Sequence, residues 1–256
     1  MNRFIQAGAL LAVLTVTCLV MLPATWVDTL LQDNTRGSLS MTGTSGALWR
    51  GEGTLQAILP NGDAVTLAPV AWHIAIGELL TLRLHIVLRS SQNGSPILDL
   101  SSSPGETRIH EARLELPAAM LGALSPTLRS AALSGQMAVQ ATDMRLDVGH
   151  ATGKARIMWM SASSELSAVR PLGNYQLDLD GQGGGLDMRL TTLGGALNLT
   201  GSGRMQPGKP ADIKITATPI EARRQELAPL LRMLGREISP GTYQLTLDPN
   251  VRAVSG

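Results

Sequence analysis

The chain has 256 residues, and its 21 Lys and Arg nearly balance its 20 Asp and Glu, which leaves a formal net charge of +1. This balance argues against nucleic acid as a partner, because nucleic-acid binding needs a strongly basic surface. With one Phe, two Tyr and four Trp, stacking on bases or sugars is hard to arrange. The length is sufficient for one large β domain or two small ones.

An uncharged apolar run from Phe4 to Leu22 is the first feature of the chain. As a helix it would cover about 28 Å, close to the ~30 Å hydrocarbon core of a bilayer. Trp26 follows where an interfacial aromatic would lie. Arg3 precedes the run and Asp28 follows it, so the distribution of basic residues predicts a cytoplasmic N-terminus.

Besides an uncleaved anchor, this run has two other interpretations: a cleaved signal peptide and a lipoprotein. A cleaved signal peptide has a shorter apolar region that ends in an Ala-x-Ala-like site, whereas this run ends in Leu-Pro-Ala-Thr-Trp. A lipoprotein is expected to carry a leucine three residues before its cysteine, where this chain has Thr15 before Cys18. We therefore expect residues 1–27 to form a cytoplasmic N-terminus and a transmembrane signal-anchor.

Apolar residues recur near every second position in a long series of segments that starts after Arg36. Such a period-two pattern is typical of half-buried β-strands. Asn61-Gly62 and Asn93-Gly94 separate consecutive segments, as expected for hairpin turns. The predicted strands are 38–44, 47–59, 65–74, 81–90, 97–100, 107–116, 132–142, 144–148 and 154–161.

The second half of the chain is rich in glycine between residues 173 and 204, which predicts an antiparallel meander. Its short strands are 175–179, 186–190 and 196–199, and a last strand covers 241–247. Short helices are expected at 27–32, at 117–124 and from 218 to Gly235, where Pro229 should kink or divide the last helix. The predicted fold is mainly β: one N-terminal transmembrane helix, then a large antiparallel β domain in a curled or meandering sheet.

A similar succession of strand, proline-started helix and strand occurs at residues 109–139 and 213–247. It suggests the duplication of one supersecondary unit, and chance similarity in a chain rich in Gly and Ala is the alternative.

Motifs for catalysis, cofactors or metals are missing from the sequence. The four histidines lie in four separate segments, without metal-ligand spacing, and are expected to be solvated strand residues: His73, His85, His110 and His150. No Gly-x-Ser-x-Gly sequence occurs. The glycines from Gly181 to Gly185 lead into a strand, so they are expected to form a turn and not a phosphate loop.

Several segments, taken in their order and spacing, resemble one known family. They are GTSGALWRGEG at 43–53, VAWHI at 70–74, PLGNYQL at 171–177, LGGALNLTGSG at 193–203, and LLRMLG at 230–235 followed by GTY at 241–243. Together they resemble protein N of the bacterial type II secretion system, the general secretory pathway protein N. The resemblance extends over nearly the whole chain, and Gly195 stands where the family is expected to have a proline.

This resemblance implies an accessory component of the machine that exports folded periplasmic proteins through the outer membrane. It implies a single-pass protein of the cell inner membrane, with residues 28–256 as a periplasmic antiparallel β domain. Its partners would be the other inner-membrane components of the system. No enzymatic activity, catalytic residue, cofactor or metal comes with the resemblance.

Five residues match the family as structural markers: Trp49, Gly51, Trp72, Gly201 and Gly203. The tryptophans are expected to anchor the core of the sheet, and the glycines to allow tight turns or close backbone approach.

Two functional hypotheses follow from the sequence. The first is an interaction protein whose exposed strand edges pair with a partner. The alternative is a periplasmic lipid-binding or lipid-transfer module, in which the strands curl into a trough with an apolar inner face. The alternation of Leu82, Leu84, Ile86 and Leu88 motivates this alternative, although a packed core explains the same residues more simply. An enzyme is the least favoured class.

Overall fold

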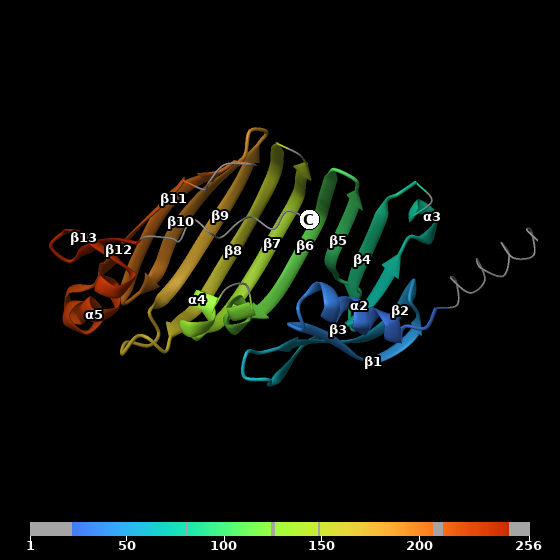
Figure 1. Ribbon diagram of the computed structural model, residues 1–256, viewed down its shortest axis with the longest axis horizontal. Coiled ribbons are helices and arrows are strands. Elements are labelled where there is room, and N and C mark those ends of the chain that lie inside the picture. The colour runs from blue at the N-terminus through green and yellow to red at the C-terminus, as the bar shows by residue number, and fades with distance from the viewer. Residues whose placement is uncertain (1–21, 80, 124–125, 148, 207–211, 246–256) are drawn as a thin grey trace, which may run out of the picture.

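The computed structural model describes residues 22–79, 81–123, 126–147, 149–206 and 212–245. These residues form one antiparallel sheet of 14 strands that follow one another in space almost in chain order (Figure 1). Only the last two strands exchange places, so that the sheet ends in the order β12, β14, β13. The predicted mainly β fold with a meandering antiparallel sheet is confirmed.

The first seven strands are β1 (Leu39–Ala47), β2 (Arg50–Ile58), β3 (Ala64–Ile74), β4 (Leu84–Ser90), β5 (Pro96–Ser103), β6 (Glu106–Pro117) and β7 (Leu133–Asp147). The other seven are β8 (His150–Ser164), β9 (Gly173–Gln182), β10 (Leu186–Gly195), β11 (Leu197–Met205), β12 (Asp212–Pro219), β13 (Gly235–Ser239) and β14 (Thr242–Leu245). Most connections are short turns, which is why neighbours in the chain become neighbours in the sheet.

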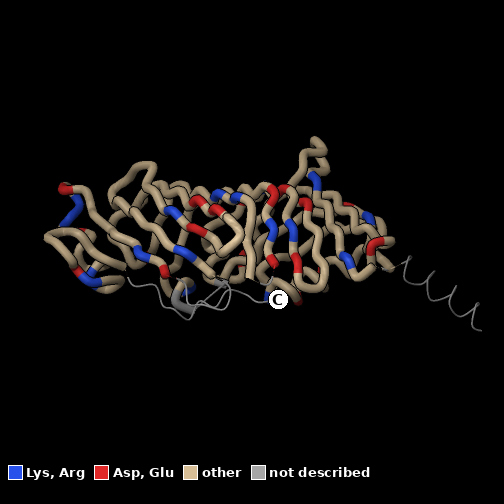
Figure 2. The backbone as a smooth tube through the Cα atoms, turned by 90° about the horizontal axis from the view of Figure 1, so that it is seen from above, with Lys and Arg blue, Asp and Glu red and all other residues tan. Residues whose placement is uncertain are grey.

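The pairing register divides the sheet into an apolar and a polar face, because cross-strand partners lie on the same face. Trp72 pairs with Leu88, and Leu88 pairs with Leu98. Leu98 pairs with Ala112, which pairs with Ala141. Charged side chains lie on the opposite face, and Figure 2 shows both signs scattered along the length of the sheet. This distribution agrees with the near-zero net charge.

The described helices are short: α2 (Thr25–Asn34), α3 (Ile76–Leu79), η1 (Ala118–Ala123), α4 (Pro126–Ser130), η2 (Glu221–Arg223) and α5 (Arg224–Leu234). In the described part of the chain no helix has the length and apolar character needed to cross a membrane. The predicted transmembrane segment lies outside the described residues, except for its last residue, Leu22.

The structure corrects two of the strand predictions. Leu82 was expected to share a strand face with Leu84, but β4 begins only at Leu84, and Leu82 lies in the preceding turn with a left-handed φ of 56°. Segments 132–142 and 144–148 were expected as two strands and form the single strand β7, whose register shifts between Thr142 and Arg145. A β-bulge there interrupts the alternation without ending the strand.

The closing helix also differs from its prediction. Thr218, expected at its start, belongs to β12, and the helical segment begins three residues later, at η2. Pro229 lies inside α5 and does not divide it. Because Pro229 is exposed, the carbonyl that lacks its helical hydrogen bond can be hydrated. Gly235 ends the helix as predicted, but it also opens strand β13, which the sequence did not indicate.

Candidate functional site

Trp72 and Gly51, two of the five predicted marker residues, pair directly across β2 and β3. Trp72 is 3% exposed, and its Nε1 donates a hydrogen bond of 3.0 Å to the Leu48 carbonyl. A Cβ on Gly51 would lie 2.6 Å from Cζ2 of Trp72, a distance that side-chain carbons do not tolerate. Trp49 is half-buried in the turn between β1 and β2, where its carbonyl accepts a 2.7 Å hydrogen bond from the Ile74 amide.

Gly201 and Gly203, the other two marker glycines, lie on the apolar face of β11. Each faces an isoleucine of β12, since Gly201 pairs with Ile215 and Gly203 with Ile213. An added Cβ would lie 3.0 Å from Cγ1 of Ile215 at the first position and 2.9 Å from Cγ1 of Ile213 at the second. The glycines therefore leave space for the two isoleucines to lie across the strand.

Helices cover the apolar face at both ends of the sheet. At the N-terminal end, Val27 and Leu31 of α2 pack against a cluster formed by Met41, Leu55, Val70 and Trp72. At the C-terminal end, α5 buries three leucines against β11, β12 and β14: Leu227, Leu230 and Leu231. Both ends therefore have a two-layer core of helix on sheet.

Among the described residues, the middle of the apolar face has one small buried cluster, formed by Ala112, Ala141 and Met144. Figure 1 shows the described helices gathered at the two ends of the sheet and at one edge near β6 and β7. The large apolar side chains of the middle strands are half-buried: Leu98, Leu100, Ile109, Leu114, Leu116, Val139, Ile157, Leu177, Leu179, Met188 and Leu190. Apolar side chains that stay partly exposed next to one another on a protein surface often mark a binding surface.

A cavity of about 310 Å³ opens where the hairpin of β4 and β5 is shorter than its neighbours. Its walls come from β2, β3, β5, β6 and β7, and they include Leu55, Leu67, Ile97, Leu114 and Val139. The polar side chains Arg113, Glu115 and Gln140 also line it. The lining combines apolar and polar residues, as small-molecule sites often do.

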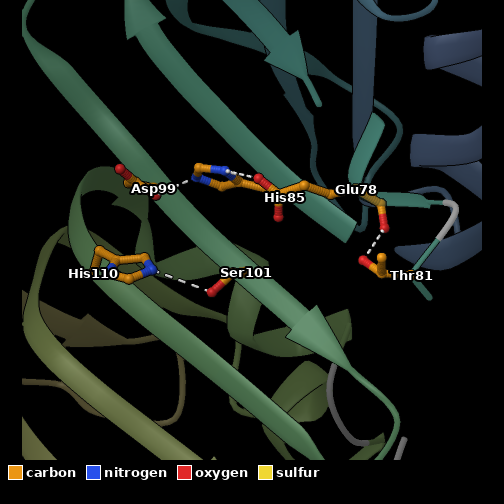
Figure 3. Close-up of polar contacts among 6 residues, drawn as sticks. All are labelled: Glu78, Thr81, His85, Asp99, Ser101 and His110. Atoms are coloured by element: carbon orange, nitrogen blue, oxygen red, sulfur yellow. Dashed lines mark hydrogen bonds and ion pairs between the residues drawn. The ribbon is translucent and has the colours of Figure 1, made fainter. Parts of the chain in front are cut away.

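A polar cluster lies on the opposite face, around His85 of β4. Its Nε2 is 3.0 Å from Oδ1 of Asp99, and its Nδ1 is 3.3 Å from Oε1 of Glu78 (Figure 3). Both nitrogens can donate to these carboxylates only when the imidazole is protonated. Hydrogen bonding to Asp99 therefore raises the pKa of His85, with a further rise from Glu78, while partial burial acts in the opposite direction.

His110 of β6 lies close to His85 although strand β5 separates β4 from β6, and the two ring centroids are 6.2 Å apart. Its Nε2 is 3.1 Å from Oγ of Ser101, whereas the carboxylates of the cluster bind His85. This arrangement does not form the nucleophile, base and acid order that acyl transfer requires. Within the described ranges, no three His, Cys, Asp or Glu side chains come together in a way that could hold a metal ion.

The pairing of His85 with His110 and with two carboxylates was missed by the sequence analysis, which expected four isolated, solvated histidines. These residues lie on different strands and approach one another only through the register of β4, β5 and β6. The bulge between Asp99 and Leu100 makes this approach harder to predict, because it shifts the register of β5 against β6. No local sequence signal marks such a register shift.

Comparison with protein-family models finds a match to type II secretion system protein N over residues 37–246. Searches of curated proteins and of solved structures found no match. The matched range covers every strand of the sheet from β1 to β14 and contains all five predicted marker residues. The chain therefore belongs to the family of type II secretion system protein N.

Proposed function

We propose that this chain is an inner-membrane-anchored accessory component of the type II secretion system, which supports the export of folded periplasmic proteins by protein–protein interaction. The family match over residues 37–246 is the observation that carries the proposal. In this proposal the N-terminus is cytoplasmic, residues 28–256 are periplasmic, and the chain performs no enzymatic step. Its partners are other inner-membrane components of the system.

The C-terminal edge of the sheet offers a surface for such a partner. Among the described residues, β13 pairs only with β14, so its other backbone edge is open for pairing. Ile238 of β13 and Met233 of α5 are 53% and 60% exposed. An extended segment of a partner can add to such an edge by main-chain hydrogen bonds and place apolar side chains against these residues.

Photo-crosslinking in living cells tests this surface. A photoreactive amino acid at Ile238 should give adducts with another component of the secretion system, and one at exposed Thr142 of β7 serves as the control. Equal adducts at both positions, or none at Ile238, would contradict the proposed edge.

The proposed anchoring is tested separately. If the protein functions only when it is held at the inner membrane, its release from the membrane should abolish secretion. Replacing residues 1–27 with a cleavable signal peptide should deliver a folded periplasmic domain that no longer supports secretion. Full secretion by the released domain would show that tethering is not required.

The middle of the apolar face, which no described helix covers, favours a second candidate, a lipid-binding or lipid-transfer module. Leu177, Leu190 and their neighbours form the wall that acyl chains would contact. Mass spectrometry of the purified chain should then find phospholipid in stoichiometric amounts. Leu190→Asn should lower this amount, whereas Arg189→Asn on the opposite face should not. A lipid-free wild-type chain argues against the module.

A further inference from the structure

The first described residues lie against the turn between β1 and β2. The Leu22 carbonyl accepts a 2.8 Å hydrogen bond from the Leu48 amide, and Pro23 forms an isolated bridge with Ala47. Residues 1–21, which include most of the proposed anchor, therefore join the domain at this turn.

One rim of the sheet contains this turn and the connection from β3 to β4. The strands are antiparallel, so β1 and β3 end where β2 and β4 begin, and Arg50 pairs with His73 near this end. The same rim continues to the start of β6, since Leu84 pairs with Ser102, and Ser102 with Thr107. We call it the anchor-side rim.

Large apolar side chains are exposed at the anchor-side rim. Leu82 is 73% exposed, Trp26 is 51% exposed and Ile76 is 37% exposed. Leu82 also has a left-handed φ of 56°, a conformation that costs a leucine on the order of 1 kcal/mol. Strained backbone positions cluster at functional sites. A leucine that such a turn holds in solvent therefore points to a contact with a partner or a membrane.

Basic side chains accompany these apolar residues. Arg50 and Arg83 are both exposed, and neither forms an ion pair with another residue in the described part of the chain. Aromatic, aliphatic and arginine side chains together are the composition of a surface that lies at the boundary between lipid headgroups and acyl chains.

Arg83 is one of the residues that line a polar cavity of about 450 Å³. Two of its cations are neutralised, since Arg145 pairs with Glu106 at 3.0 Å and Arg108 with Asp143 at 3.8 Å. Nε of Arg108 is nevertheless buried without a hydrogen-bond partner. Arg83, in contrast, has no ion-pair partner among the described residues that line this cavity, so its guanidinium is available to a lipid phosphate.

We propose that the anchor-side rim rests on the phospholipid bilayer, with Leu82 and Ile76 among the headgroups and with Arg50 and Arg83 on lipid phosphates. This inference rests on the proposed anchoring and goes beyond it, because a tether alone leaves the orientation of the domain free. Contact along the rim makes the strands rise from the membrane and presents both faces of the sheet to the periplasm.

Depth-dependent fluorescence quenching tests the contact. The full chain, with Cys18→Ser, receives a single labelled cysteine as Leu82→Cys or Ile76→Cys and is reconstituted into vesicles of phosphatidylcholine and phosphatidylglycerol. Lipids spin-labelled near the headgroup should quench the label about twofold or more at both positions, because interfacial side chains lie within ~5–10 Å of the headgroup boundary. Met233→Cys, at the other end of the sheet, should remain unquenched.

A second variant separates the proposed contact from simple proximity. Arg83→Gln should lower the quenching at position 82, whereas Arg236→Gln, an exposed arginine of β13, should leave it unchanged. Equal quenching at positions 82 and 233, or none at 82, would overturn the inference. Alkaline extraction of the same vesicles reports whether the chain is anchored, so that failure of the rim contact and failure of the anchor are distinguishable.

Discussion

The two ends of the sheet and its middle are built from the same kind of strand, but they differ in what packs against their apolar face. At the ends, α2 and α5 bury Val70, Leu227 and Leu231 completely or almost so. In the middle, leucines at equivalent positions of the pattern, such as Leu177 and Leu190, stay half-buried. The alternation of apolar residues therefore defines a face, and whatever packs on that face decides whether it becomes a core or a binding surface.

Because of this difference, the ends contribute mainly to stability and the middle is available for binding. The ends supply much of the folding free energy that holds the long sheet together, because α2 and α5 exclude water from the apolar face there. The middle can then remain available to a partner without unfolding the domain.

The largest expected effect is at the C-terminal end. Leu231→Ala should lower the free energy of unfolding by about 2–5 kcal/mol, because it empties a fully buried site. Leu177→Ala, in the middle, should cost roughly 1 kcal/mol, since only part of the side chain is removed from water. Denaturant unfolding of both variants measures the difference. Equal losses would show that the middle is packed as tightly as the end.

A glycine variant tests the N-terminal end. Gly51→Ala should cost about 1–3 kcal/mol, because the new methyl group overlaps the indole of Trp72. Gly77→Ala is the matched control: no atom lies within 4 Å of its Cβ position, and alanine favours the helix there. Thermal unfolding followed by circular dichroism compares them, and a neutral Gly51→Ala would be inconsistent with the close approach.

The attachment of α2 to the sheet depends on Asp28. Its Oδ1 accepts hydrogen bonds of 2.7 Å from the Met41 amide and 3.0 Å from the Ser40 hydroxyl. Asp28→Ala should therefore lower the free energy of unfolding by about 1–2 kcal/mol. Asp33→Ala on the same helix, where the side chain is exposed, should change it little. A similar loss in both variants would mean that helix charge, and not the attachment, is responsible.

The smallest effect concerns pH and lies in the middle of the sheet. Asp99 raises the pKa of His85 above its ordinary value of 6.5, against the effect of burial, and Glu78 adds to the rise. The stabilisation by protonated His85 is thus fully present below the unfolded pKa and is lost as pH rises through the folded pKa. His85→Gln should flatten this decline in the unfolding midpoint. A decline that persists unchanged in His85→Gln assigns it to other groups.

Much of the fold could be predicted because its signals are local. The period-two alternation and the Asn-Gly turn at Asn61 specify strands and hairpins within a few residues of chain. Leu82 continues the alternation and was therefore placed in β4, although the turn that holds it depends on contacts with α3 and on a strained φ.

The candidate site was less accessible to prediction, because it depends on register and on packing. His85 and His110 meet across two strand pairings, and each pairing contains a register shift. Strand β13 pairs with β14 after a helix that ends at Gly235, where the sequence indicated only the helix stop. An apolar pattern also cannot show which part of a face a helix will cover, so the open middle became visible only in the structure.

Thiol accessibility tests most directly whether the helices of the described part of the chain close the apolar face at its ends and leave it open in its middle. In the full chain with Cys18→Ser, held in membrane vesicles, single cysteines at positions 177 and 231 are reacted with a water-soluble maleimide. Leu177→Cys should be labelled rapidly, and Leu231→Cys should stay protected until the domain unfolds. Equal protection of both cysteines would contradict this arrangement, because the middle of the face would then be covered as fully as the end.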